Sequence, residues 1–119
     1  MNKLLFLVDD TDSILTLGAS ILENDFRVLT MSSAGKMFTL LEKKQPDLII
    51  LDIEMPEING FEACAMIKEN PTLSTIPVLF LTGYIDEKIK SKAKELGAQG
   101  VINKSEINTA LLDTAKQYT

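Results

Sequence analysis

The chain has 119 residues, 45% of them hydrophobic, which suits one domain with a substantial apolar core. Its net charge of −5 argues against direct binding to nucleic acid, and the lack of histidine excludes imidazole catalysis and histidine-ligated zinc within the chain. Its one cysteine, Cys64, excludes an internal disulfide and fits a reducing cytoplasm, and no apolar run reaches the roughly 18 residues of a membrane span or forms a signal peptide.

Short apolar runs without alternation recur along the chain, and a segment with helical spacing of apolar residues follows each one. Such runs predict strands that are buried on both faces of a parallel sheet. In chain order, the pattern predicts strand Leu4–Val8 and helix 12–23, strand Phe26–Thr30 and helix 33–44, strand Asp47–Asp52 and helix 60–69, strand Ile76–Thr82 and helix 85–96, and strand Gln99–Asn103 and helix 106–118. This alternation predicts an α/β fold with helices on both faces of the sheet. Periodicity does not determine the order of the strands.

Local signals mark several ends of these elements. Ser32 or Ser33 is expected to cap the second helix, and Gly97 suits the position just after the fourth. The pair Asn59-Gly60 often forms a hairpin, but its flanks do not alternate, so we interpret it as a loop entering the third helix.

Polar side chains follow four of the predicted strands at the points where those strands end. The carboxyl ends of parallel strands meet at one edge of a sheet, where such folds bind their ligands. The sequence therefore brings four acids, a hydroxyl and an ammonium to one rim, a set that suits a divalent cation and a phosphoryl group. These residues are Asp9, Asp10, Asp52, Glu54, Thr82 and Lys104.

The acids of this rim are candidate ligands for Mg²⁺, which prefers a few carboxylate oxygens, keeps some waters and accepts phosphate oxygens. Two adjacent aspartates repel each other without a counter-charge. Asp10 and Asp52 are candidate direct ligands, Asp9 can act through water, and Glu54 can lend its backbone carbonyl. Alternatively, Asp9 and Asp10 cap the first helix and Asp52 starts a loop, but acids at two strand ends favour the metal site.

Asp52 is also a candidate nucleophile, because carboxylates form acyl phosphates in some phosphoryl-transfer proteins. Such chemistry needs neutralisation of charge on the phosphoryl oxygens, which Lys104 and the metal can supply, while the Thr82 hydroxyl can donate a hydrogen bond. Taken singly, Lys104 could be a surface lysine, and Thr82 could be present for its β-propensity. Their occurrence together favours a functional site.

Several segments together resemble the receiver domain of two-component response regulators, in particular single-domain chemotaxis-like receivers. They are Val8-Asp9-Asp10, Leu51-Asp52-Ile53-Glu54-Met55-Pro56-Glu57-Ile58-Asn59-Gly60, Leu81-Thr82-Gly83, Gly97-Ala98 and Lys104. The resemblance covers residues 1–119, so we expect one receiver domain and no separate output domain. It implies a flavodoxin-like (βα)5 fold with strand order 2-1-3-4-5.

The resemblance also implies a function. Asp52 would accept a phosphoryl group, in a Mg²⁺-dependent reaction, from a sensor histidine kinase, a histidine phosphotransfer protein or a small phosphodonor. Asp9 and Asp10 would hold the metal, Thr82 would sense the phosphoryl oxygen, and Lys104 would pair with it. We therefore expect a cytoplasmic signalling phosphoacceptor rather than an enzyme, which acts through an unknown protein target or by onward phosphotransfer.

Two positions depart from the pattern of this family. Receivers usually have a proline after the lysine, often in a cis bond, where this chain has Ser105; a cis bond without proline costs about 3 kcal/mol. They also usually carry an aromatic residue three positions before the lysine, where this chain has Val101. Neither departure alters the phosphorylation chemistry directly, but both affect how a signal would leave the site.

Two other functions compete with this interpretation. A degenerate receiver would serve only as a protein-binding module, but the intact acids, Thr82 and Lys104 argue against it. A small flavin-binding electron carrier of similar architecture would need a phosphate loop rich in Ser, Thr and Gly after the first strand. This chain instead has the acidic segment 9–12 there.

Overall fold

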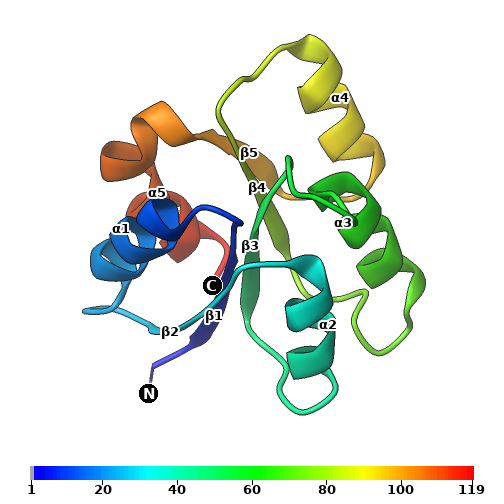
Figure 1. Ribbon diagram of the computed structural model, residues 1–119, viewed down its shortest axis with the longest axis horizontal. Helices are drawn as coiled ribbons and strands as arrows, with labels where there is room; N and C mark the ends of the chain where they lie inside the picture. The colour runs from blue at the N-terminus through cyan, green and yellow to red at the C-terminus, as the bar shows by residue number, and fades with distance from the viewer. Residues whose placement is uncertain (1) are drawn as a thin grey trace.

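The computed structural model describes residues 2–119 as a five-stranded parallel sheet with helices on both faces (Figure 1). The strands lie in the order β2-β1-β3-β4-β5, which confirms the order 2-1-3-4-5. None of the helices within residues 2–119 has both the length and the apolar character that a membrane crossing requires. In chain order the elements are β1 (Leu4–Val8), α1 (Asp12–Leu22), β2 (Arg27–Met31), α2 (Ala34–Leu41), β3 (Leu48–Asp52), α3 (Gly60–Glu69), β4 (Val78–Thr82), α4 (Glu87–Glu95), β5 (Gly100–Asn103), a 3₁₀ turn (Lys104–Glu106) and α5 (Ile107–Gln117).

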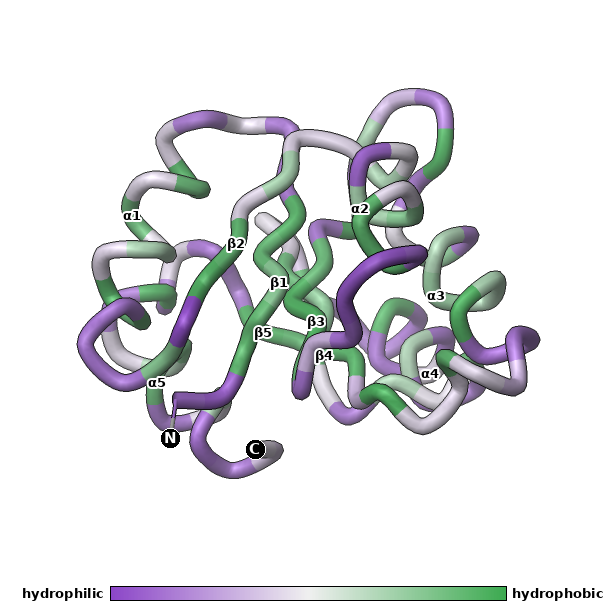
Figure 2. Tube along the Cα trace, turned by 90° about the horizontal axis from the view of Figure 1, so that it is seen from below, coloured by the Kyte–Doolittle hydropathy of each residue, from purple (hydrophilic) through white to green (hydrophobic). Residues whose placement is uncertain are grey.

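The strands are apolar without alternation because the sheet has a core on each face. Phe6 and Phe80 point toward α2, α3 and α4, whereas Leu7 and Leu79 point toward α1 and α5. All residues of β3 and β4 are buried. Figure 2 shows the apolar strands β1 and β3 inside a layer of more polar helices and loops. Burial on both faces fixes the strands, so that the carboxyl ends of the sheet form a rigid rim.

Several predicted boundaries shift by one to three residues; strand β4, for example, begins at Val78 rather than Ile76. Local hydrogen bonds explain three of these shifts. Strand β2 begins one residue late because the Phe26 N–H donates to the Leu22 carbonyl at 3.0 Å and closes the end of α1. Helix α4 begins two residues late because the Asp86 side chain accepts from the Ile89 N–H at 2.8 Å and caps it. Helix α2 ends at Leu41, three residues early, in a turn where the N–H groups of residues 43 and 44 both reach the carbonyl of residue 40.

The expected capping residues are in place at the start of α2 and at the end of α4, and α3 also begins with a capping residue. Ser33 accepts from the Lys36 N–H at 3.1 Å at the start of α2. Asn59 caps α3, which confirms that Asn59-Gly60 enters a helix rather than a hairpin. Gly97 follows α4 with a φ of 86°, in the left-handed region that glycine adopts most easily. The loop between β3 and α3 contains the other positive φ among residues 2–119, 68° at Glu57.

We predict that Glu57→Gly stabilises the protein. A left-handed backbone costs an ordinary residue about 1–2 kcal/mol, and the greater freedom of glycine in the unfolded chain offsets part of that gain. The free energy of unfolding in urea should therefore rise by about 0.5–1 kcal/mol. The control is Glu42→Gly, because Glu42 is also exposed but has a φ of −68°; this substitution should destabilise the protein. A loss of stability in Glu57→Gly would contradict the prediction.

Candidate functional site

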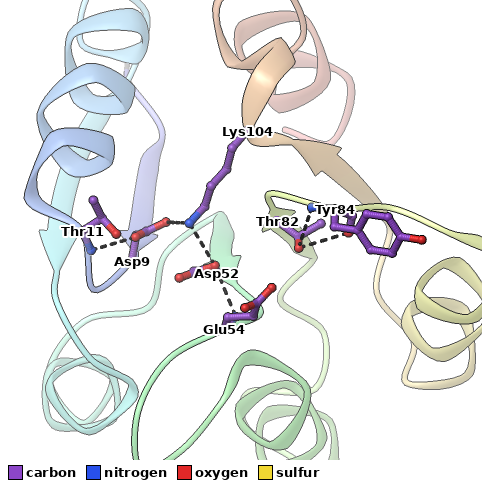
Figure 3. Close-up of polar contacts among 7 residues, drawn as sticks. All are labelled: Asp9, Thr11, Asp52, Glu54, Thr82, Tyr84 and Lys104. Atoms are coloured by element: carbon purple, nitrogen blue, oxygen red, sulfur yellow. Dashed lines mark hydrogen bonds and ion pairs between the residues drawn. The ribbon is translucent and has the colours of Figure 1, made fainter.

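The predicted rim residues converge at the carboxyl ends of β1, β3, β4 and β5 (Figure 3). Asp9 directly follows β1, and its N–H donates to the carbonyl of Met31 at 3.1 Å. Asp52 and Thr82 are the last residues of β3 and β4, and Lys104 directly follows β5. Asp9, Asp52 and Thr82 are buried, which is unusual for such polar side chains and requires partners for them.

Lys104 bridges the two buried carboxylates. Its Nζ lies 2.9 Å from Asp9 Oδ2 and 3.2 Å from Asp52 Oδ1. The lysine side chain is 23% exposed, so its ammonium reaches inward from the edge of the site (Figure 3). Burial alone would lower the pKa of Lys104, but its hydrogen bonds and charge interactions with Asp9 and Asp52 outweigh burial and raise that pKa. Lys104 is therefore a fixed positive charge at neutral pH.

The remaining carboxylate oxygens are only partly satisfied. Asp9 Oδ1 accepts from the Thr11 N–H at 2.8 Å, and Asp52 Oδ1 accepts from the Glu54 N–H at 3.3 Å. Asp52 Oδ2 is buried without a hydrogen-bond partner among residues 2–119, and Asp9 Oδ2 makes only its ion pair with Lys104. A buried carboxylate oxygen without a partner is costly, so the Asp52 side chain is poised to accept a cation or to react.

The acids fit a divalent cation. Asp9, Asp10 and Asp52 each offer a carboxylate oxygen, and the three oxygens lie within 4.8 Å of one another. Asp10 is exposed, unlike the other two, so it faces the side from which an ion would arrive. Three carboxylates against the one Lys104 ammonium leave an excess of negative charge, and Mg²⁺ binds such oxygen donors. That the backbone carbonyl of Glu54 joins them stays a prediction.

The environment of Asp52 also shifts its titration. Burial, and then the neighbouring charge of Asp9, raise the pKa of Asp52 from 3.8 to about 6, although Lys104 and the Glu54 N–H oppose this shift. Metal binding and attack on phosphorus both require the ionised carboxylate. Ionisation of Asp52 is therefore less favourable in the metal-free folded protein than in water.

Thr82 is close to the acids in the fold, but its hydroxyl is engaged elsewhere. Thr82 Oγ1 donates to the carbonyl of Tyr84 at 3.2 Å and accepts from the Tyr84 N–H at 3.4 Å (Figure 3). The Tyr84 side chain is exposed beside the site. The hydroxyl thus ties the start of the loop between β4 and α4 to the end of β4. We refer to residues 82–86 as the β4–α4 loop.

The two departures from the family pattern have local structural consequences. The Lys104–Ser105 peptide bond is trans. Asn103 Oδ1 accepts from both the N–H and the hydroxyl of Ser105, at 2.9 and 2.8 Å. A side-chain turn therefore orders the backbone around Lys104, with Ser105 at the position where proline usually stands. Val101 is half-buried and pairs with Phe80 of β4. It borders a hollow of about 410 Å³ between α4 and β5.

Gly60 is a site residue whose role the sequence did not reveal. A Cβ atom on Gly60 would lie 2.2 Å from the backbone carbonyl oxygen of Asp52 and 2.8 Å from the Cα of Ile53. Gly60, the first residue of α3, therefore contacts the peptide group that joins Asp52, the candidate nucleophile, to Ile53. Glycine in the Asn59-Gly60 pair is the available signal, but it indicates a loop that enters a helix rather than this contact.

Residues 5–116 match the family model described as the response regulator receiver domain. The chain belongs to this family. Receiver domains are signalling phosphoacceptors that take a phosphoryl group on an aspartate and bind Mg²⁺ at an acidic pocket. They interact with histidine kinases or phosphotransfer proteins and with downstream targets.

Known relatives include both long regulators and proteins of similar length. The chain is 35% identical over 105 residues to the regulatory protein PhoP of Bacillus subtilis, which covers 87% of this chain and 43% of PhoP. It is 34% identical over 103 residues to RcaC of Microchaete diplosiphon, which covers 87% of this chain and 16% of RcaC. It therefore spans less than half the length of either. PilH of Pseudomonas aeruginosa is 29% identical over 114 residues, with 96% of this chain and 94% of PilH covered.

The fold is also that of solved receivers. Chemotaxis protein CheY4 of Vibrio cholerae matches with a TM-score of 0.93 and 26% sequence identity over the full length of both chains.

We predict that Asp52→Asn stabilises the metal-free protein at neutral pH. Asp52 binds its proton more tightly in the folded state, so stability falls as pH rises from about 4 to about 6, and the full penalty applies above that range. Removing this carboxylate should raise the free energy of unfolding at pH 7.5 by up to about 3 kcal/mol, and the gain should vanish near pH 4. Urea unfolding of both proteins in the presence of a chelator, at pH 7.5 and at pH 4, would measure this difference in the free energy of unfolding. Asp113→Asn, at an exposed position, should show no such pH-dependent gain.

Proposed function

We propose that this chain is a phosphorylation-switched signalling receiver in which Asp52 is the phosphoacceptor. The observation that carries the proposal is the buried Asp52 carboxylate, which has one oxygen without a partner, beside the Lys104 ammonium and within the cluster formed with Asp9 and Asp10. The phosphodonor would be the phosphohistidine of a sensor kinase or phosphotransfer protein, or a small acyl phosphate.

The chemistry follows from these side chains. An Asp52 oxygen attacks phosphorus, a P–O bond forms, and the P–N bond of phosphohistidine breaks, with its electrons left on the imidazole. Asp9, Asp10, Asp52 and the Glu54 carbonyl would hold Mg²⁺, whose charge would offset that of the phosphoryl oxygens. Lys104 supplies a further positive charge in a partly desolvated site, where it stabilises developing negative charge strongly. The Thr82 hydroxyl can donate to a phosphoryl oxygen once it leaves Tyr84.

Asp52 would be both the reacting group and the site of modification, so the phosphoryl transfer would modify only this protein. Asp52 is consumed by phosphorylation and is regenerated when water or a phosphotransfer histidine removes the phosphoryl group. The chain would therefore catalyse only its own phosphorylation and dephosphorylation. The output would be a protein contact or onward phosphotransfer, and the buried free Cys64 supports a reducing, cytoplasmic setting.

The alternative of a degenerate receiver has no observation in its favour. The acids and the ammonium that the chemistry needs lie together, and Thr82 ends the neighbouring strand β4. A pure binding module would not need a buried carboxylate with an unpartnered oxygen, because such a group costs stability without a ligand.

We predict that Asp52 alone carries the phosphoryl group. Acetyl phosphate with Mg²⁺ should add one phosphoryl group to the wild type, as intact mass shows, and trapping the acyl phosphate by reduction should locate it at Asp52. Asp52→Ala should remain unmodified, while Asp113→Ala should react like the wild type because that aspartate is exposed on α5 and lies outside the cluster of Asp9, Asp10 and Asp52. An acyl phosphate at another aspartate would refute the assignment.

We further predict that switching passes through the β4–α4 loop rather than through Val101. When Thr82 donates to the phosphoryl group, its bond to the Tyr84 carbonyl must break, which releases the loop between Thr82 and the Asp86 cap of α4. Val101 has a short side chain with a stiff χ1 and cannot sweep the path of an aromatic ring. NMR shifts on adding beryllofluoride and Mg²⁺ should therefore be large at residues 82–86 and smaller along β5. Large shifts along β5 with a silent loop would refute the idea.

A further inference from the structure

The loop between β3 and α3 is held at both ends by hydrogen bonds, one to the side chain of Asp52 and one to the backbone carbonyl of Ile53. At its start, the Glu54 N–H donates to Asp52 Oδ1 at 3.3 Å. At its end, the Gly60 N–H donates to the Ile53 carbonyl at 2.8 Å. The loop also contains the left-handed Glu57, so its path is constrained rather than relaxed. The position of the Glu54 backbone therefore depends on where Gly60 is held.

Gly60 is in direct contact with the peptide group that joins Asp52 to Ile53. The 2.2 Å from an added Cβ to the Asp52 carbonyl oxygen shows that no heavy atom fits between them. A displacement of Gly60 by a few tenths of an ångström must therefore move this peptide group or open a gap beside it. Either change alters the backbone from which the Asp52 side chain projects.

Two side-chain hydrogen bonds hold Gly60 in place from either side of it. The Glu62 N–H donates to Asn59 Oδ1 at 2.9 Å, and the Asn59 N–H donates to Glu62 Oε1 at 3.0 Å. This reciprocal pair is a capping box, which satisfies free N–H groups in the first turn of a helix. Glu62 is exposed and lies outside the cluster of Asp9, Asp10 and Asp52.

From this chain of contacts we infer that Glu62 is a positioning residue for the metal site. Through Asn59 and Gly60 it fixes the Asp52–Ile53 peptide group and the backbone of Glu54. The inference rests on the proposed function, because it assumes that these groups bind Mg²⁺. This role differs from that of an ordinary helix cap in its consequence. Loss of the Asn59–Glu62 hydrogen bonds should weaken metal binding in a protein that is still folded.

The test compares three substitutions on α3. Glu62→Ala removes the acceptor for the Asn59 N–H, whereas Glu62→Gln removes the charge and keeps an acceptor oxygen in the same place. Glu69→Ala is the matched control, since it removes an exposed acid from the other end of the same helix. Mg²⁺ alone is titrated at a temperature well below each melting temperature, and the amide shifts of the rim are followed by NMR.

Partners beyond the direct ligands of a metal typically change its affinity about 10- to 100-fold, and Glu62 acts one contact further away. Glu62→Ala should therefore weaken Mg²⁺ binding about 3- to 10-fold. Glu62→Gln should stay within about twofold of the wild type, and Glu69→Ala should be unchanged. In the metal-free protein, the Gly60 amide should exchange with solvent faster in Glu62→Ala than in Glu62→Gln. Asn59→Ala, which breaks the other half of the box, should repeat the loss.

The outcomes separate this inference from the proposed function. If Glu62→Ala melts at a lower temperature but binds Mg²⁺ as tightly as the wild type, the box only stabilises α3 and the inference is overturned. An equal loss of affinity in Glu62→Gln would assign the effect to charge and would also overturn it. If the wild type itself shows no Mg²⁺ response at Asp9, Asp10 and Asp52, the proposed metal site is wrong and the inference fails with it.

Discussion

The structure depends on one electrostatic constraint, the placement of the Lys104 ammonium between two buried carboxylates. Parallel pairing of β1 with β3 puts Asp9 and Asp52 side by side at the same rim, away from water. Two ionised acids in that position would repel each other, and Lys104 reduces this repulsion. Burial, and then the charge of Asp9, still keep the pKa of Asp52 raised. The three carboxylates outnumber the one ammonium, and such a residual negative charge suits a divalent cation.

The rest of the fold keeps the carboxyl ends of the strands, which form this rim, in fixed positions. Apolar residues on both faces of the sheet fix the strands, because neither face can move without exposing buried side chains. The loops that leave the rim are then free to differ in chemistry. The loop after β3 is constrained by Gly60 and the Asn59–Glu62 capping box. Between its start at Thr82, whose hydroxyl bonds to Tyr84, and the Asp86 cap of α4, the β4–α4 loop has no comparable support among these bonds. The first arrangement suits a fixed ligand set and the second suits a movable element.

The two departures from the receiver pattern, Ser105 and Val101, do not change the reacting groups. They change the backbone conformation next to Lys104 and the side chain on β5 that would respond to phosphorylation. Asn103 and Ser105 form a side-chain turn that orders the backbone at Lys104 in a trans bond. Val101, at the position where the family usually carries an aromatic residue, borders the hollow between α4 and β5. These substitutions are compatible with the same chemistry because neither side chain contacts Asp52 in the interactions that define the site.

The sequence by itself determined the alternation of strands and helices, the residues at the rim and the entry of Asn59-Gly60 into a helix. Those features follow from apolar periodicity and from local capping, both of which are encoded over a few neighbouring residues. The strand order came from the resemblance of the motifs, since periodicity carries no information about which strands pair. Only the tertiary structure decided that Lys104 contacts both Asp9 and Asp52, that Asp10 is exposed while Asp9 is buried, and that Gly60 touches the Asp52 peptide group. Such contacts join residues far apart in the chain, and their distances are set by strand register and packing across the whole sheet.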